Sequence, residues 1–297
     1  MGTRKDLRRQ RLDALIGGFD QYVLAYDRQV PFTKTGQFEN HVETLRIRRL
    51  AGSVETAIAD DRFMESLWLT LRAWGIGVRA SLMLDLPEFA TEIRGHADTL
   101  VELDNTHLAM STSDQAQDVA NLVSSLAVVS NKAKLVATTK TLHHLLPDLV
   151  VPIDRRYTGA FFGWHVSEFQ SSQQLIFETA WEAFVEIARA TEPERLVGPG
   201  WRTSTTKVID NAIVGYCLVE GLGGPRDSKN SPATGRQPSK PRRLSWTVET
   251  LEEDLAQFEK DLQSAGLKPN SVDTYVGRAD TFIRWLAGRY KPRGPNA

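Results

Sequence analysis

The sequence predicts an all-α protein: a large helical N-terminal domain, a flexible basic linker and a small C-terminal helical bundle. Along most of the chain apolar residues recur at spacings of three and four, as on one face of a helix, whereas alternating strand-like runs are scarce. Apolar residues make up 41% of the 297 residues, which is enough to build a sizeable core. A chain of this length usually forms more than one domain. We therefore expect helical domains at residues 1–223 and 246–297, joined by residues 224–245.

The N-terminal domain contains seven segments with helical periodicity. In residues 62–74 the apolar side chains fall on one stripe, and Gly75 then ends the helix. The other segments are residues 7–27, a short helix after Pro87, and residues 114–128, 132–146, 171–190 and 204–220.

Charge is distributed unevenly along the chain, although the net charge is only −1. Residues 1–223 hold 23 basic and 28 acidic residues, residues 224–245 hold six and one, and residues 246–297 hold seven and eight. The middle segment is rich in Pro, Ser and Gly and has almost no apolar residues, so it cannot bury enough surface to offset chain entropy. We predict a flexible linker whose basic residues, Arg242 and Arg243 among them, contact phosphates. A merely soluble linker is the alternative.

The chain has the features of a cytoplasmic protein. Its one cysteine, Cys217, cannot form an internal disulfide, lies in an apolar run and is expected to pack in the core. The N-terminus is charged and has no apolar signal region. The longest apolar stretch, near residues 211–219, is too short to span a bilayer. We therefore expect no membrane partner.

The sequence offers little sign of a metal or a cofactor. None of the six histidines has zinc-ligand spacing, so we expect no bound metal. The common phosphate-binding, dinucleotide-binding and serine-nucleophile motifs are missing, so we expect no cofactor. His143 and His144 are adjacent on a helix and point about 100° apart, which predicts that one is half-buried and the other exposed. Arg46, Arg48 and Arg49 are expected on a solvated helix surface.

The C-terminal segment contains two amphipathic helices separated by a turn. The apolar positions of the first helix are Leu251, Leu255, Phe258 and Leu262. Asn270 or Ser271 is expected to cap the second helix. The second helix is expected to bury Val272, Tyr275, Val276, Ala279, Phe282, Ile283 and Leu286.

Residues 248–290 resemble the SAM-like core-binding domain of tyrosine recombinases, the phage integrases. That family has an amphipathic helix, a Gly-Leu-Lys/Ser-Pro-Asn-Thr turn and then Tyr-x-x-x-Leu-x-x-Phe-x-x-Trp. This chain reads Gly266-Leu267-Lys268-Pro269-Asn270-Ser271, followed by Tyr275, Ala279, Phe282 and Trp285. It departs from the pattern at Ser271, where Thr is commoner, and at Ala279, where Leu is commoner. Neither change alters which positions are expected to pack between the helices.

The resemblance implies DNA integration as the biological setting and double-stranded DNA as the partner. In the family this domain clamps one side of the duplex. A helix N-terminus favours phosphate, and arginines can reach phosphates or base edges. Carried onto this chain, the DNA-binding residues are Lys268, Asn270, Ser271, Thr274, Arg278 and Arg284, with Arg242 and Arg243 of the linker. The alternative, favoured by the module's net charge of −1, is that these are ordinary solvated positions.

Recombinase activity is not part of this expectation. In the family a catalytic domain with a nucleophilic Tyr and an Arg–His–Arg cluster follows the module, and the sequence after residue 290 leaves no room for one. Phe282 and Trp285 are expected in the core and at its rim rather than stacked on bases.

Residues 132–162 carry a second motif. A Lys-bearing helix runs into Leu-Pro-Asp, and a Val-Pro-Ile-Asp stretch ending at Asp154 opens a new helix. This segment resembles the late part of helix-hairpin-helix DNA glycosylases, in which a Val-Pro-x-Asp places the catalytic Asp at a helix start, about twenty residues after a Lys. Lys134 lies twenty residues before Asp154, and Lys140 lies fourteen before it.

The second resemblance implies that Asp154 stabilises an oxocarbenium-like sugar and that Lys134 or Lys140 attacks it, after the base has flipped out. The family's hairpin has a Gly-x-Gly turn, whereas residues 126–134 contain no glycine. The alternative is that Asp154 is a helix cap, worth about 1 kcal/mol to its helix. Residues 68–80 and 134–162 also resemble bacterial proteins of unknown function, which implies no activity.

Three functions therefore stay open. The sequence favours a non-enzymatic DNA-binding protein whose N-terminal domain holds a protein partner or more DNA. The second is a helix-hairpin-helix glycosylase-like enzyme acting on DNA bases through Asp154. The third is a protein-interaction scaffold, which the near-neutral charge of the C-terminal module keeps open.

Overall fold

The computed structural model of the chain describes residues 3–77, 82–223, 248–264 and 269–290. The predicted all-α fold is confirmed: these residues form helices, and their one strand-type pairing is an isolated antiparallel bridge between Met83 and Val129. The chain divides into two compact units, Met1–Ser228 and Lys229–Ala297, called here the N-terminal unit and the C-terminal unit. The predicted linker, residues 224–245, lies outside the described residues. No helix in the described ranges has both the length and the apolarity needed to cross a bilayer.

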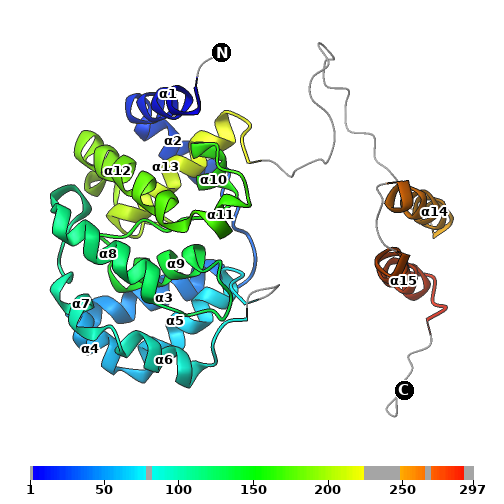
Figure 1. Cartoon of the computed structure of the whole chain (residues 1–297), viewed down its shortest axis with the longest axis horizontal. Helices are drawn as coiled ribbons and strands as arrows, with labels where there is room; N and C mark the ends of the chain where they lie inside the picture. The colour runs from blue at the N-terminus through cyan, green and yellow to red at the C-terminus, as the bar shows by residue number, and fades with distance from the viewer. Residues whose placement is uncertain (1–2, 78–81, 224–247, 265–268, 291–297) are drawn as a thin grey trace. The chain divides into compact units, whose positions relative to one another are not determined.

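The N-terminal unit is built from helices α1 to α13, with 3-10 turns at Leu108–Met110 and Pro193–Leu196. Figure 1 shows α3 to α9 gathered in the lower half of this unit, and α1, α2 and α10 to α13 in its upper half. The helices are α1 (Arg4–Gly17), α2 (Phe19–Arg28), α3 (Gln37–Leu50), α4 (Val54–Ala59), α5 (Asp61–Ala73), α6 (Leu86–Arg94), α7 (Ala97–Glu102), α8 (Ser113–Ser125), α9 (Leu135–Leu145), α10 (Tyr157–Phe162), α11 (Glu168–Ser171), α12 (Gln173–Thr191) and α13 (Thr205–Val219).

Short sequence signals set several helix ends. Thr3 forms a capping box with Asp6 at the start of α1, and the Ser204 hydroxyl accepts a hydrogen bond from the Lys207 amide at the start of α13. The continuous helix predicted over residues 7–27 is wrong, because Gly18 separates α1 from α2. Two adjacent glycines weaken the helix at this point, and the break lets each half bury its own apolar face.

The crossing of α13 over α2 depends on Gly215. A Cβ atom added there would lie 1.9 Å from the carbonyl oxygen of Tyr22, so the two backbones can approach this closely only without a side chain. Cys217, also on α13, is fully buried and its thiol donates to the backbone carbonyl of Tyr157 on α10 at 3.4 Å, which confirms its expected packing role. This crossing fixes the first turns of α13, which carry Lys207 and Asp210.

Helix α3 buries a charged residue that the sequence was expected to leave in water. Arg48 is only 7% exposed, pairs with Asp104 and donates to the backbone carbonyl of Leu145. The predicted solvated position is therefore wrong for Arg48. Arg46 does lie on the surface, paired with Glu43 at 2.7 Å.

The C-terminal unit contains α14 (Val248–Ser264) and α15 (Pro269–Leu286), which pack against each other. Of its described residues, only Val272 and Ile283 are buried. The predicted burial of Tyr275, Phe282 and Leu286 is wrong: their exposed fractions are 51%, 57% and 46%. Two packed helices bury only the side chains between them. The apolar face of α15 is broader than this contact, so the rest of that face stays exposed to solvent.

Candidate active-site pocket

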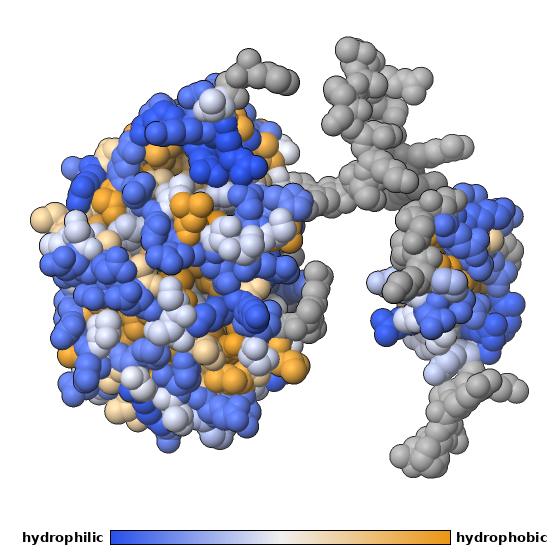
Figure 2. Space-filling model, in the orientation of Figure 1, coloured by the Kyte–Doolittle hydropathy of each residue, from blue (hydrophilic) through white to orange (hydrophobic). Residues whose placement is uncertain are grey.

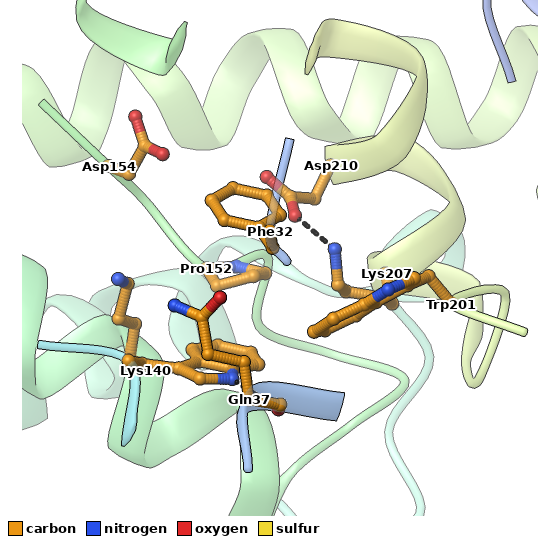
Figure 3. Close-up of a pocket in the computed structure, with 9 residues that line it drawn as sticks. Phe32, Gln37, Lys140, Pro152, Asp154, Trp201, Lys207 and Asp210 are labelled. Atoms are coloured by element: carbon orange, nitrogen blue, oxygen red, sulfur yellow. Dashed lines mark hydrogen bonds and ion pairs between the residues drawn. The ribbon is translucent and has the colours of Figure 1, made fainter. Parts of the chain in front are cut away.

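A pocket with about 410 Å³ of empty space, including its open mouth, lies in the N-terminal unit. That space includes the gaps between the lining atoms and the solvent at the mouth, and the cavity itself measures about 50 Å³, which is room for a few water molecules. Figure 3 shows the residues that line it. They are Phe32, Gln37, Trp74, Lys140, Pro152, Asp154, Trp201, Lys207 and Asp210.

The lining comes from both halves of the unit. Gln37 is the first residue of α3, Trp74 follows α5, and Lys140 lies in the middle of α9. Asp154 belongs to the segment between α9 and α10, and α13 contributes its first turns. The pocket therefore forms only when helices far apart in the sequence come together.

Aromatic rings form much of the wall. The Trp74 and Trp201 ring centroids are 6.3 Å apart, and those of Phe32 and Trp201 are 6.0 Å apart. The Trp74 indole N–H donates to the backbone carbonyl of Gln37 at 3.0 Å, which holds this ring in place. Such a wall suits a planar ligand, because stacked or tilted aromatic pairs are favourable.

One ammonium group of the pocket is fully satisfied by protein partners. Lys207 is 1% exposed, and its Nζ lies 2.6 Å from both Asp210 Oδ2 and Asn211 Oδ1. The same Nζ lies 5.2 Å from the Tyr26 ring centroid and 5.1 Å from that of Trp201. Burial raises the pKa of the Asp210 carboxyl, and the neighbouring Lys207 opposes this rise. Lys207 therefore holds α13 and Asp210 in place.

The second ammonium group, that of Lys140, has fewer protein partners. Lys140 Nζ lies 5.4 Å from the Trp74 ring centroid, and within the described part of the chain it makes no side-chain hydrogen bond like those of Lys207. Burial lowers the pKa of Lys140, while the carboxylates of Asp154 and Asp210 act in the opposite direction. A lowered pKa increases the fraction of neutral amine, the form that acts as a nucleophile.

Asp154 has two roles in the structure. Its Oδ1 accepts a hydrogen bond from the Tyr157 amide at 2.6 Å, which is the capping contact considered from the sequence. Asp154 is also one of the residues that line the pocket. In Figure 3 it lies on the same side of the view as Lys140, apart from it, and across from Lys207.

Lys140 and Asp154 both line the pocket, whereas Lys134 does not. Lys134 precedes α9, and its Nζ donates to the backbone carbonyl of Ser125 at 3.1 Å. The family's spacing of about twenty residues between Lys and Asp favours Lys134, which is not among the residues that line the pocket. Sequence reasoning missed Lys207 and Asp210, although two charged residues three apart in an otherwise apolar helix were a usable signal.

Three histidines lie close together next to the pocket wall. His41, His143 and His144 are all fully buried, so the predicted exposure of one of the adjacent pair is wrong. Helix α9 packs against α3, α5 and α8, which cover it in several directions. His41 Nδ1 lies 2.9 Å from His144 Nε2, and the His41 ring stacks on Trp201 at 5.4 Å.

Burial keeps these imidazoles neutral. It lowers the pKa of His144 to about 4 and those of His41 and His143 well below the ordinary 6.5. The neighbouring histidines lower the pKa of His41 further. The neutral cluster supports Trp201 and, through it, the aromatic wall.

The predicted DNA-binding residues all belong to the C-terminal unit, whereas the pocket is formed by residues of the N-terminal unit. Asn270, Thr274 and Arg278 are exposed on α15, and Ser271 is half-buried. Arg284 is exposed but pairs with Asp280 at 2.8 Å. Asn270 and Ser271 belong to the first turn of α15, not to a cap before it. Arg242, Arg243 and Lys268 lie outside the described residues.

Comparisons with known proteins give no match: no family model, curated protein or solved structure matches the chain. The two resemblances found in the sequence therefore stay predictions. In the described parts of the chain, no group of three or more His, Cys, Asp or Glu side chains is placed to bind a metal ion. The geometry of the pocket is consequently the feature from which a function can be inferred.

Proposed function

We propose that the N-terminal unit is an enzyme that removes a base from DNA, with Lys140 as the nucleophile and Asp154 as its carboxylate partner. The observation that supports this proposal is that Lys140 and Asp154 line one aromatic-walled pocket. The helix-hairpin-helix resemblance points to the same aspartate, and the presence of Lys140 rather than Lys134 in the pocket lining supports Lys140 as the lysine.

The chemistry follows from the states of these two groups. The neutral Lys140 amine bonds to C1′ of the sugar, while the bond from C1′ to the base breaks. The base leaves with the bonding electrons and takes a proton from water. The amine passes its proton to the Asp154 carboxylate, whose charge also stabilises the cationic sugar as it forms. The ring oxygen takes this proton back from the Asp154 carboxyl group as the sugar ring opens, which leaves a Schiff base on Lys140. Water then hydrolyses the Schiff base and frees the amine.

The proposal requires the pocket to open further when a flipped base enters, because the cavity alone holds only a few water molecules. Phe32, Trp74 and Trp201 surround that space with aromatic rings. The Gln37 side-chain oxygen accepts a hydrogen bond from the Lys34 amide at 3.1 Å. Its amide N–H groups are therefore the part of Gln37 that can donate to a ligand, and they are suited to a base carbonyl.

The direct test is to incubate the protein with duplexes that each carry one damaged or mismatched base, to cut the resulting abasic sites with hot alkali, and to follow the cleaved strand. We expect Lys140→Ala to lower the cleavage rate at least about a thousandfold, because loss of a nucleophile removes the covalent route. Lys134→Ala is the matched control and should retain the wild-type rate. Asp154→Asn should also lose activity; if it matches wild type, or if Lys140→Ala does, the assignment fails.

A second function, duplex DNA binding by the C-terminal unit, is favoured by one observation. Asn270, Thr274 and Arg278 are exposed on α15, as contact with a duplex requires. Arg284 supports it less, since Asp280 already pairs with that side chain. In this proposal the basic linker supplies much of the attraction for phosphate.

A further inference from the structure

The C-terminal unit exposes its aromatic side chains to an unusual degree. In the described residues, the exposed aromatic side chains all belong to this unit. On α15, Tyr275, Phe282 and Trp285 are 51%, 57% and 61% exposed. The rings of Phe282 and Trp285 stack on each other at 6.0 Å.

These side chains form one continuous surface. Tyr275 and Phe282 are seven residues apart, as are Arg278 and Trp285, so each pair lies two helical turns apart in one column. The two columns are neighbours on the helix. We call this surface, made of Tyr275, Arg278, Phe282 and Trp285, the α15 stripe.

The C-terminal unit has a very small buried core. Val272 and Ile283 are its buried residues within the described ranges. Ordering two helices costs backbone entropy at every residue. So small a core cannot offset that cost, and single small units of this kind usually need oligomerisation or another staple. The α15 stripe is the apolar area whose burial would supply the missing stabilisation.

We propose that the α15 stripe packs against the same stripe of a second copy of the chain, so that two α14–α15 pairs form a four-helix bundle. Homodimer interfaces are apolar and enriched in aromatic residues and Arg, which is the composition of the stripe. A two-fold axis pairs a surface with itself, and a self-complementary apolar stripe meets that condition. This inference does not depend on the proposed function of the pocket.

Other occupants fit the surface less well. The described surface of the N-terminal unit exposes no aromatic side chain, and its exposed aliphatic residues, such as Leu24, Leu50 and Met110, lie on separate elements. It therefore offers no matching apolar area. On the α15 stripe nucleic acid is disfavoured by charge, because α14 has six acidic residues and one basic residue. The same charge favours a second copy, whose Arg278 can approach the acidic α14. The duplex contact proposed above then rests on Asn270, Thr274 and the basic linker, and not on Arg278.

The test is sedimentation velocity of the full chain over a range of concentrations. We expect a dimer for wild type and a monomer for the double variant Phe282→Ser with Trp285→Ser. The matched control is Leu50→Ser, which removes an apolar side chain 74% exposed on the N-terminal unit and should remain dimeric. A wild-type chain that is monomeric at every concentration, or a double variant that still dimerises, overturns the proposal.

A second, milder variant distinguishes loss of the dimer from unfolding of the helices. Arg278→Glu changes one exposed side chain, leaves the buried residues intact and should keep the helix content measured by circular dichroism. It places a carboxylate near the acidic α14 of the second copy, and we expect the dissociation constant to rise about tenfold. An unchanged dissociation constant contradicts the packing proposed. A monomer whose Trp fluorescence is quenched by single-stranded oligonucleotide would assign the stripe to nucleic acid and overturn the dimer.

Discussion

The two units treat their aromatic side chains in opposite ways. The N-terminal unit buries most of them, and several line a pocket that holds two lysines and two aspartates. The C-terminal unit leaves Tyr275, Phe282 and Trp285 exposed. Figure 2 shows mostly polar atoms over the visible face of the N-terminal unit, with separate apolar patches. Helical periodicity therefore indicates which side of a helix is apolar, but not whether another element covers that side.

The largest stability effect should come from the helix crossing that builds the pocket. Gly215→Ala places a methyl group against the backbone of Tyr22, so α13 must shift away from α2. We expect a loss of about 3 kcal/mol in the free energy of unfolding of the N-terminal unit. Chemical denaturation followed by circular dichroism measures it.

The control for this variant is Gly277→Ala on α15, where an added Cβ meets nothing within 4 Å. It should leave the N-terminal transition unchanged. Equal losses for the two substitutions would show that the difference between the units is not one of packing.

Acid should weaken the N-terminal unit through its buried histidines. Their folded-state pKa values lie below the ordinary 6.5, so below pH 6.5 the unfolded chain binds protons that the folded unit does not. Their contribution is complete above pH 6.5 and is lost as the pH falls towards about 4, the pKa of His144. Between pH 6.5 and 5.5 we expect a loss of about 1 kcal/mol per histidine.

Thermal unfolding across that pH range measures this effect. Replacing His144 with Gln should flatten the pH dependence, whereas replacing the exposed His165 with Gln should not. The raised pKa of Asp210 acts in the opposite direction and reduces the observed slope. A stability that is constant from pH 7 to pH 5 would mean that the histidines are not held neutral.

The smallest effect should distinguish the units by their response to salt. If the C-terminal unit and the linker contact DNA phosphates, each lost contact lowers the slope of log affinity against log salt by about 1. Arg242→Ala with Arg243→Ala should therefore lower the slope by about 2 in a fluorescence anisotropy titration with duplex DNA. If removal of residues 224–297 leaves duplex affinity unchanged, those residues do not bind the duplex.

Much of the fold could be predicted from the sequence where apolar residues alone are buried. The predicted segments 62–74 and 204–220 agree closely with α5 and α13. Helix α3 was missed because its buried residues include His41, Thr44 and Arg48, which leave no apolar stripe to detect.

The candidate site was only half predictable. The Val-Pro-x-Asp pattern identified Asp154, but spacing along the chain could not choose between Lys134 and Lys140. That choice depends on where α9 begins and on which of its faces meets the pocket. Gln37, Trp74 and Trp201 gave no local signal, since the pocket joins segments far apart in the sequence.

Borohydride trapping on DNA that contains an abasic site tests the central claim most directly. The Lys140 amine should condense with the sugar aldehyde, losing water, and borohydride should reduce the resulting Schiff base to a stable amine. We predict a covalent protein–DNA product on a denaturing gel for wild type and for Lys134→Ala, and none for Lys140→Ala. A product of equal yield from Lys140→Ala, or no product from wild type, would contradict the account.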